Sequence, residues 1–312
     1  MPLISVIIPL YNKDFSIGRT LESVLRQTFT DFEIIIVNDG STDKSVEKVL
    51  EFSDSRIHLF HQKNEGAASA RNSGISKASG SLIAFLDGDD VWFENHMEKL
   101  AKLYTDFPDC GLYCSRYLMK ISKNNIIAIS YKDSVQDNYR GILPDYFASS
   151  MKFRVGLTSA LAIPKTILNT DMLFNPEVSS GQDLELFTKI AIKHHVAITG
   201  TYTLEYNFSL ENQLSKTPIT RKKLMDFSQF SEAEKNNKSL KNFLDLYRVE
   251  YALHYHMFGD THKSQFYLKE VDKENIGFKT RLLFHLPGLF LRTLLKIKRV
   301  LNKVGINFTV YH

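Results

Sequence analysis

Three aspartates within four residues are the densest chemical feature of this 312-residue chain. Asp87, Asp89 and Asp90 directly follow an apolar run that ends at Leu86. Carboxylates this close repel one another unless a positive charge lies between them. Hard oxygen ligands suit Mg²⁺ or Mn²⁺, which keeps coordination positions for phosphate oxygens. The cluster therefore favours a divalent metal site over a solvated acidic turn, and the missing distal ligands argue against an EF-hand calcium loop.

Further polar residues stand where other apolar runs end. Tyr11 follows Pro9, and its ring could stack on a flat ligand ring. Asp39 can accept a hydrogen bond from a base N–H or a ribose hydroxyl, although its pairing with Gly40 is also a frequent turn signal. Arg71 lies in a helix start rich in small residues, where it could reach a diphosphate. For a lone arginine, a solvated surface position is the simpler interpretation.

Asp183 opens a predicted helix after two serines and a glycine. A helix cap or a first-turn acid explains an aspartate at this position without any catalytic role. Sequence spacing alone does not bring Asp183 near Asp89.

The elements that must position these residues follow from hydrophobic periodicity. β-Branched apolar runs predict strands, and helical spacing predicts helices between them. Strand and helix in turn predict βαβ units, a mostly parallel central sheet and helices on both faces. Ligands of such sheets bind beyond the carboxyl ends of the strands, where the residues above lie. The predicted strands are 3–10, 32–37, 57–60 and 82–86, and the predicted helices are 17–26, 45–52 and 67–78.

The rest of the chain divides near residue 210. Strand and helix patterns continue to about 206, after which the sequence becomes polar and lysine-rich and then mainly helical. We therefore expect a catalytic domain over 1–210 and a helical C-terminal extension over 211–312. The further expected helices are 94–103, 183–193, 242–258 and 263–271, and the further expected strands are 111–121, 126–131, 155–163 and 196–206.

Five sequence fragments, taken in order, resemble a known family. They are residues 5–12, 37–43, 66 with 70–72, 87–90 and 181–183. Each is weak alone, but five in order at family-like spacing are specific. Over about residues 3–205 the chain resembles the family 2 inverting glycosyltransferases of the GT-A fold, of the type that builds bacterial polysaccharides. The resemblance implies the nucleotide-diphospho-sugar transferase fold.

The resemblance implies a role for each matching residue. Pro9, Tyr11 and Asp39 would line the nucleobase and ribose site, and Arg71 would lie near the nucleotide. Asp183 would be the general base.

The acidic cluster would match the family's Asp-x-Asp element. Asp87 and Asp89 would hold the ribose and a divalent ion, Mn²⁺ or Mg²⁺, and Asp90 would share the metal role. The family often has Glu before its catalytic base, whereas this chain has Gln182, which removes a charge beside the base.

The implied activity is hexosyl transfer from a nucleotide-diphosphate sugar, with a UDP-sugar expected, to a saccharide or lipid-linked saccharide. A polyprenyl-phosphate glycosyltransferase and a non-catalytic nucleotide-sugar-binding module remain alternatives. A Rossmann dehydrogenase is excluded, because its Gly-x-Gly-x-x-Gly signature is missing after the first strand, where residues 9–14 read Pro-Leu-Tyr-Asn-Lys-Asp. Nucleic acid is not an expected partner.

The C-terminal tail has an unusual charge pattern. Residues 277–312 contain no Asp or Glu but seven Lys and Arg, among many Leu and Phe. Residues 281–301 are therefore expected either to lie on an anionic membrane or to pack an apolar face on the catalytic domain.

Sequence features also bear on location. No apolar run is long enough to span a membrane, and the N-terminus lacks signal-peptide features. Cys110 and Cys114, four apart on one predicted strand, are expected to be free thiols. These features predict a cytoplasmic enzyme, with peripheral contact at the inner face of the cell membrane.

Overall fold

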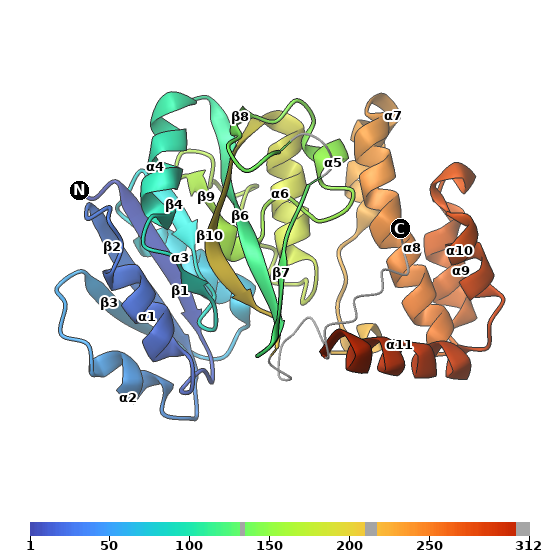
Figure 1. The fold of residues 1–312 in the computed structure, drawn as a ribbon, viewed down its shortest axis with the longest axis horizontal. Helices are drawn as coiled ribbons and strands as arrows, with labels where there is room; N and C mark the ends of the chain where they lie inside the picture. Colours follow the sequence, from blue (N-terminus) through green and yellow to red (C-terminus); the bar gives the residue numbers. More distant parts are fainter. Residues whose placement is uncertain (132–134, 210–216, 304–312) are drawn as a thin grey trace.

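The computed structural model describes residues 1–131, 135–209 and 217–303 as a mixed α/β fold (Figure 1). Its N-terminal half is a parallel sheet with the strand order β3-β2-β1-β4, which confirms the predicted βαβ units. The strands are β1 (Ile4–Leu10), β2 (Phe32–Asp39), β3 (Ile57–Gln62) and β4 (Leu82–Phe85). The connecting helices are α1 (Ile17–Leu25), α2 (Ser45–Leu50) and α3 (Ala67–Lys77).

The other half of the sheet mixes strand directions. β6 (Cys110–Ser122) and β10 (His195–Asn207) are parallel, but β9 (Leu161–Pro164) runs antiparallel between β4 and β6. Short antiparallel strands complete the sheet: β5 (Val91–Trp92) and β8 (Arg140–Ile142) on β10, and β7 (Asn125–Ala128) on β6. The sequence did not predict β5 and β8, because two or three residues carry no periodic signal. The strand expected over 155–163 is shorter than predicted, since a 3₁₀ turn occupies Thr158–Ala160.

Helices cover both faces of the sheet (Figure 1). The inner strands β1, β2 and β4 are buried on both sides, as β1 shows: Ile4, Ile7 and Ile8 have no exposed surface. α3 lies so close to β1 that a Cβ on Gly74 would come within 2.5 Å of the Ile7 side chain. Two further helices, α4 (His96–Asp106) and α6 (Gln182–Lys193), pack against β6.

The C-terminal region is helical, as predicted. It contains α7 (Ser231–Asn236), α8 (Lys238–Met257), α9 (Thr261–Lys269), α10 (Phe278–Phe284) and α11 (Gly288–Lys303). α8 packs against α5 (Tyr146–Ser149), and the Phe243 ring lies 5.5 Å from that of Phe147 in the main core. α8 therefore packs directly against the part of the molecule that contains the sheet. The domain boundary expected near 210 falls outside the described residues and stays a prediction.

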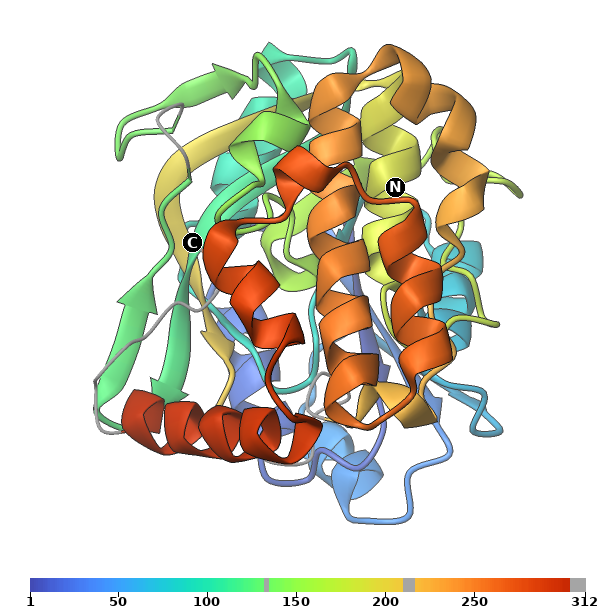
Figure 2. The same ribbon diagram turned by 90° about the vertical axis from the view of Figure 1, so that its right-hand side faces the viewer.

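α11 runs along the lower edge of the molecule, from beneath α8 toward the β6–β7 hairpin (Figure 2). Leu291 is buried against Leu253 and Met257 of α8. At the far end of α11, Asn125 Nδ2 donates to the Asn302 carbonyl at 2.6 Å. No helix in the described part of the chain is long and apolar enough to cross a bilayer.

Cys110 and Cys114 are buried free thiols, which confirms the expectation that they are not bridged. Burial raises the pKa of the Cys110 thiol to about 11, so it stays protonated and inert at neutral pH.

Candidate active site

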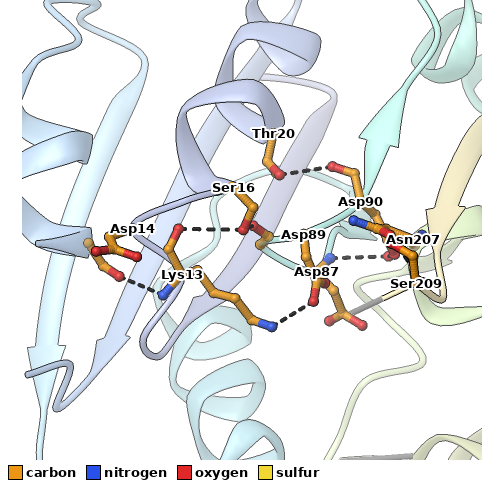
Figure 3. A network of polar contacts seen from close by, with 12 residues as sticks. Lys13, Asp14, Ser16, Thr20, Asp87, Asp89, Asp90, Asn207 and Ser209 are labelled. Atoms are coloured by element: carbon orange, nitrogen blue, oxygen red, sulfur yellow. Dashed lines mark hydrogen bonds and ion pairs between the residues drawn. The ribbon is translucent and has the colours of Figure 1, made fainter. Parts of the chain in front are cut away.

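Residues 87–90, the acidic turn after β4, are held in place by neighbouring elements (Figure 3). Two hydroxyls at the start of α1 hold its backbone: Ser16 Oγ donates to the Gly88 carbonyl at 2.7 Å, and Thr20 Oγ1 donates to the Asp90 carbonyl at 2.8 Å. Within the turn, the Asp90 amide donates to the Asp87 carbonyl at 3.0 Å. The three carboxylates therefore keep fixed positions, and each one has different partners.

Asp90 is fully buried, and both of its carboxylate oxygens are used. They accept from Ser159 Oγ at 2.5 Å and from the Asn207 amide at 2.9 Å. Burial, together with the charges of Asp89 and Asp87, raises the pKa of Asp90 well above its usual range. The metal role that the resemblance implied for Asp90 stays a prediction, and this geometry does not favour it.

Asp89 and Asp87 point toward cations instead. Lys13 Nζ lies 2.6 Å from Asp89 Oδ2, and the Asp89 side chain is 7% exposed. An Arg71 Nη lies 2.6 Å from Asp87 Oδ1, and the Asp87 side chain is 32% exposed. Burial raises the pKa of Asp89, against the opposing charge of Lys13.

The carboxylates can be tested for fit to the implied metal. The described residues contain no group of three or more His, Cys, Asp or Glu side chains placed to hold an ion. Mg²⁺ commonly binds proteins through one or two carboxylates and completes its shell with water and substrate phosphates. Asp89 and Asp87 fit such a shared site. Unlike Asp90, neither has both carboxylate oxygens bound to backbone or hydroxyl donors.

Arg71 is not the solvated surface arginine of the simpler interpretation. It is 6% exposed, and its guanidinium carbon lies 5.2 Å from the centre of the Phe174 ring. Its Nε has no hydrogen-bond partner among the described residues. A buried guanidinium with a free N–H retains capacity for an anionic ligand.

Asp39 ends β2 and is 3% exposed. Its carboxylate accepts from Gln62 Nε2 at 2.8 Å and from the amides of Glu65 and Gly66 at 2.9 and 2.8 Å. Gly66 has a φ of 88°, which favours glycine at this start of α3. Asp39 therefore fastens the loop before α3, and its role toward a nucleotide stays a prediction.

Pro9 and Tyr11 lie at the end of the neighbouring strand. Pro9 pairs with Val37 inside β1, which ends at Leu10 as predicted. The Tyr11 ring is 46% exposed and available for stacking.

Asp183 is the second residue of α6, not its cap. The N-cap is Gly181, with a φ of 90°, so the capping interpretation is wrong and the first-turn position is confirmed. The Asp183 carboxylate accepts from Arg154 and, at 2.9 Å, from the Leu184 amide. Burial would raise the pKa of Asp183, but the charges of Arg154 and Arg71 and the two hydrogen bonds lower it further, so the carboxylate is ionised at neutral pH.

Arg71 links the two parts of the site. It pairs with Asp87 and lies over the Phe174 ring, which is 6.3 Å from the Phe187 ring of α6. The acidic turn and the helix that carries the ionised Asp183 are thus linked by packing, through Arg71, Phe174 and Phe187.

This arrangement agrees with a comparison of the chain with known protein families. Residues 5–157 match the family described as Glycosyl transferase family 2. These residues form a family 2 glycosyltransferase domain. The resemblance expected from the five fragments is confirmed, and the base candidate Asp183 lies on the C-terminal side of the matched segment.

The alignments with curated relatives cover only part of each protein. A protein of Rickettsia bellii named as an uncharacterized glycosyltransferase is 36% identical over 198 residues, which is 61% of this chain and 26% of that protein. Escherichia coli WfgD, named as a UDP-Glc:α-D-GlcNAc-diphosphoundecaprenol β-1,3-glucosyltransferase, is 47% identical over 97 residues, 31% of this chain and 38% of that protein. The aligned part thus spans well under half of these relatives.

Solved structures share the fold over most of the chain. Staphylococcus aureus TarS 1–349, crystallised with UDP-GlcNAc, has a TM-score of 0.61 at 16% identity, covering 85% of this chain and 90% of that one. The expected GT-A fold is confirmed at the level of architecture.

Four residues around the family 2 site escaped the sequence analysis: Lys13, Arg154, Ser159 and Phe174. Lys13 directly follows the fragment over residues 5–12, which was used only for the residues before it. Arg154 and Ser159 follow a stretch without periodicity, and their partners are distant in sequence. No local pattern could have found them, because an ion pair between remote residues leaves no periodic signal.

Proposed function

We propose that this family 2 protein is an inverting glycosyltransferase. It moves a sugar from a UDP-sugar to a saccharide or lipid-linked saccharide, assisted by Mn²⁺ or Mg²⁺. The observation that carries the proposal is the acidic turn whose Asp87 pairs with the buried Arg71, which packs through Phe174 and Phe187 against the helix that carries Asp183. Further support comes from TarS, crystallised with UDP-GlcNAc and with UDP, and from WfgD, whose name includes a UDP-sugar and a lipid-linked acceptor.

The chemistry is one displacement. Asp183 accepts the proton of the acceptor hydroxyl while the hydroxyl oxygen attacks the anomeric carbon from the face opposite the leaving group. The new C–O bond forms as the bond to the diphosphate oxygen breaks, which inverts the configuration. The lowered pKa of Asp183 keeps the base ionised at neutral pH.

The other residues bind and orient the donor. Tyr11, Pro9 and Asp39 would meet the nucleobase and ribose, and Arg71 the diphosphate. Asp89 and Asp87 would hold the divalent ion, which when bound neutralises charge on the departing diphosphate.

A donor panel tests the proposal. The full chain, incubated with Mn²⁺ and UDP-, GDP- and dTDP-sugars, should release UDP from one or a few UDP-sugars, measured by a coupled nucleotide assay. Adding short glycans or a polyprenyl diphosphate-linked sugar should increase the release, whereas stimulation by polyprenyl phosphate alone would favour the alternative acceptor. Nucleotide binding without any release would identify a non-catalytic module and reject the proposal.

The exposed face of α11 supports peripheral membrane contact, which we propose as the location of the enzyme. While Leu291 packs on the protein, an apolar stripe points outward at helical spacing: Leu289 70%, Phe290 50%, Leu294 38%, Ile297 49% and Val300 62% exposed. Arg292, Lys296 and Arg299 are exposed beside it. Of the two interpretations of the tail, packing accounts for one side of α11 and leaves the stripe uncovered in the described chain.

Such a helix suits an anionic bilayer surface. Its apolar side chains can enter the interface while its Lys and Arg heads meet acidic lipids. α11 lies at the edge where β6 ends, through the bond between Asn125 and Asn302 (Figure 1). Because ligands bind at the carboxyl ends of the parallel strands, a membrane on this side would present a lipid-linked acceptor near the site.

The replacement of two exposed side chains tests the membrane contact without disturbing the packed side of α11. Leu289→Glu with Ile297→Glu should reduce flotation with phosphatidylglycerol-containing vesicles by more than about tenfold, since burying two large apolar side chains is worth several kcal/mol. Leu50→Glu, a matched control on α2 at 69% exposure, should float like the wild type. Equal flotation of wild type and double variant, or no flotation of the wild type, would refute the proposal.

A further inference from the structure

Lys13 is held against the acidic turn by a short ion pair. Its Nζ reaches Asp89 Oδ2 at 2.6 Å, with Lys13 22% and Asp89 7% exposed at the side chain (Figure 3). Within the described residues, Lys13 is the one side chain recorded as a partner of the Asp89 carboxylate. A cation of the protein itself therefore stands where a divalent ion would bind.

The backbone of Lys13 is fixed, so only its side chain is free to move. Asn12 adopts a left-handed φ of 50°, which asparagine tolerates better than most residues. Asn12 Oδ1 accepts from the Thr42 amide at 2.8 Å, and the Lys13 amide donates to Ser45 Oγ at 2.7 Å. These bonds anchor the loop after β1 to the loop after β2, and the flexible four-carbon stem of Lys13 extends from that anchor.

We propose that Lys13 is a displaceable counter-ion: it holds Asp89 in the empty enzyme, yields to the divalent ion, and then neutralises the donor's diphosphate. The inference rests on the metal-assisted transfer proposed above. A divalent ion on Asp89 would repel an ammonium group bound to the same carboxylate. Lysine suits the second position because its ammonium is a compact charge that binds phosphate oxygens in many orientations.

The proposal makes metal and nucleotide binding interdependent. Without nucleotide, Mn²⁺ must displace Lys13 and so binds weakly. With UDP present, the displaced ammonium has a new anionic partner, so Mn²⁺ binds more tightly. By linkage, Mn²⁺ must strengthen UDP binding by the same factor.

A Mn²⁺ titration of the full chain tests this, using the electron paramagnetic resonance signal of free Mn²⁺ with and without UDP. Lys13→Met should bind Mn²⁺ alone about tenfold more tightly than the wild type, the usual worth of one charge-assisted hydrogen bond. The gain in Mn²⁺ affinity on adding UDP should shrink by at least the same factor. Lys13→Arg keeps the charge and should bind Mn²⁺ alone as weakly as the wild type. Lys44→Met, at an exposed lysine on the neighbouring loop, should behave like the wild type throughout.

If Lys13→Met is too unstable for titration, the Mn²⁺-induced rise in its unfolding temperature, measured by circular dichroism, should exceed that of the wild type. An unchanged or weaker Mn²⁺ affinity in Lys13→Met would overturn the counter-ion role and leave the proposed transfer intact. An absence of Mn²⁺ binding in every protein, even with UDP, would overturn both this inference and the metal part of the proposed function.

Discussion

Asp183→Asn should slow sugar transfer by roughly 10²–10⁴-fold, the usual contribution of a general base. Asparagine has nearly the same shape but cannot take the proton of the acceptor hydroxyl. Donor affinity should survive, because the proposed donor contacts are Asp39, Arg71 and Asp89. The measurement is paired: UDP affinity by calorimetry and transfer rate on the same sample.

The control for Asp183→Asn must account for the ion pair that Asp183 makes with Arg154. Arg154 is 17% exposed at its side chain and pairs with Asp183, so the substitution also weakens an ion pair and stability must be measured alongside. Glu185→Gln is a matched comparison: Glu185 lies on the same first turn of α6, is 4% exposed at its side chain and pairs with Lys189 at 2.6 Å. It should lose stability but keep most of its transfer rate.

Three results are distinguishable. Wild-type transfer by Asp183→Asn would eliminate the base assignment. Loss of donor affinity together with transfer would make Asp183 a part of the donor site. An equal loss in Asp183→Asn and Glu185→Gln would point to damage at the start of α6 instead of lost base chemistry.

Removing the metal should lower the rate of sugar transfer at least as much as Asp183→Asn does. Enzyme treated with EDTA, and Asp89→Ala with Mn²⁺ present, should both fall below about one thousandth of the wild-type transfer rate, since a bound ion contributes several kcal/mol to stabilising the leaving charge. Adding Mn²⁺ should restore the EDTA-treated wild type but not Asp89→Ala.

Asp54→Ala controls for the loss of an ion-paired carboxylate. Asp54 pairs with Arg56 at 2.8 Å just before β3, outside the acidic turn, and its removal should leave transfer unchanged. Asp89→Ala frees Lys13, but that side chain is partly exposed and can find water, so the fold should persist. Full turnover in EDTA would refute the metal role, and Lys13 would then be the permanent counter-ion of Asp89.

Much of the fold could be predicted from the sequence because its signals are local. The parallel strands β1 to β4 are β-branched runs with helical spacing between them, and buried parallel strands are hydrophobic on both faces. Asp87 and Asp89 could be singled out because they follow such a strand directly. The antiparallel direction of β9 and the short strands β5 and β8 escaped prediction, because pairing direction depends on where the chain returns and two or three residues carry no periodicity.

The sequence by itself determined which residues stand at the strand ends and the family pattern in which they occur. The tertiary structure decided what each of them contacts. Lys13 meets Asp89 across 76 residues of sequence and Arg154 meets Asp183 across 29, and charges so separated come together only when the sheet forms. The tertiary structure also decided the orientation of the C-terminal helix. Its composition allowed either apolar side to pack on the protein. Packing against α8 buried the side of Leu291 and left the stripe from Leu289 to Val300 exposed.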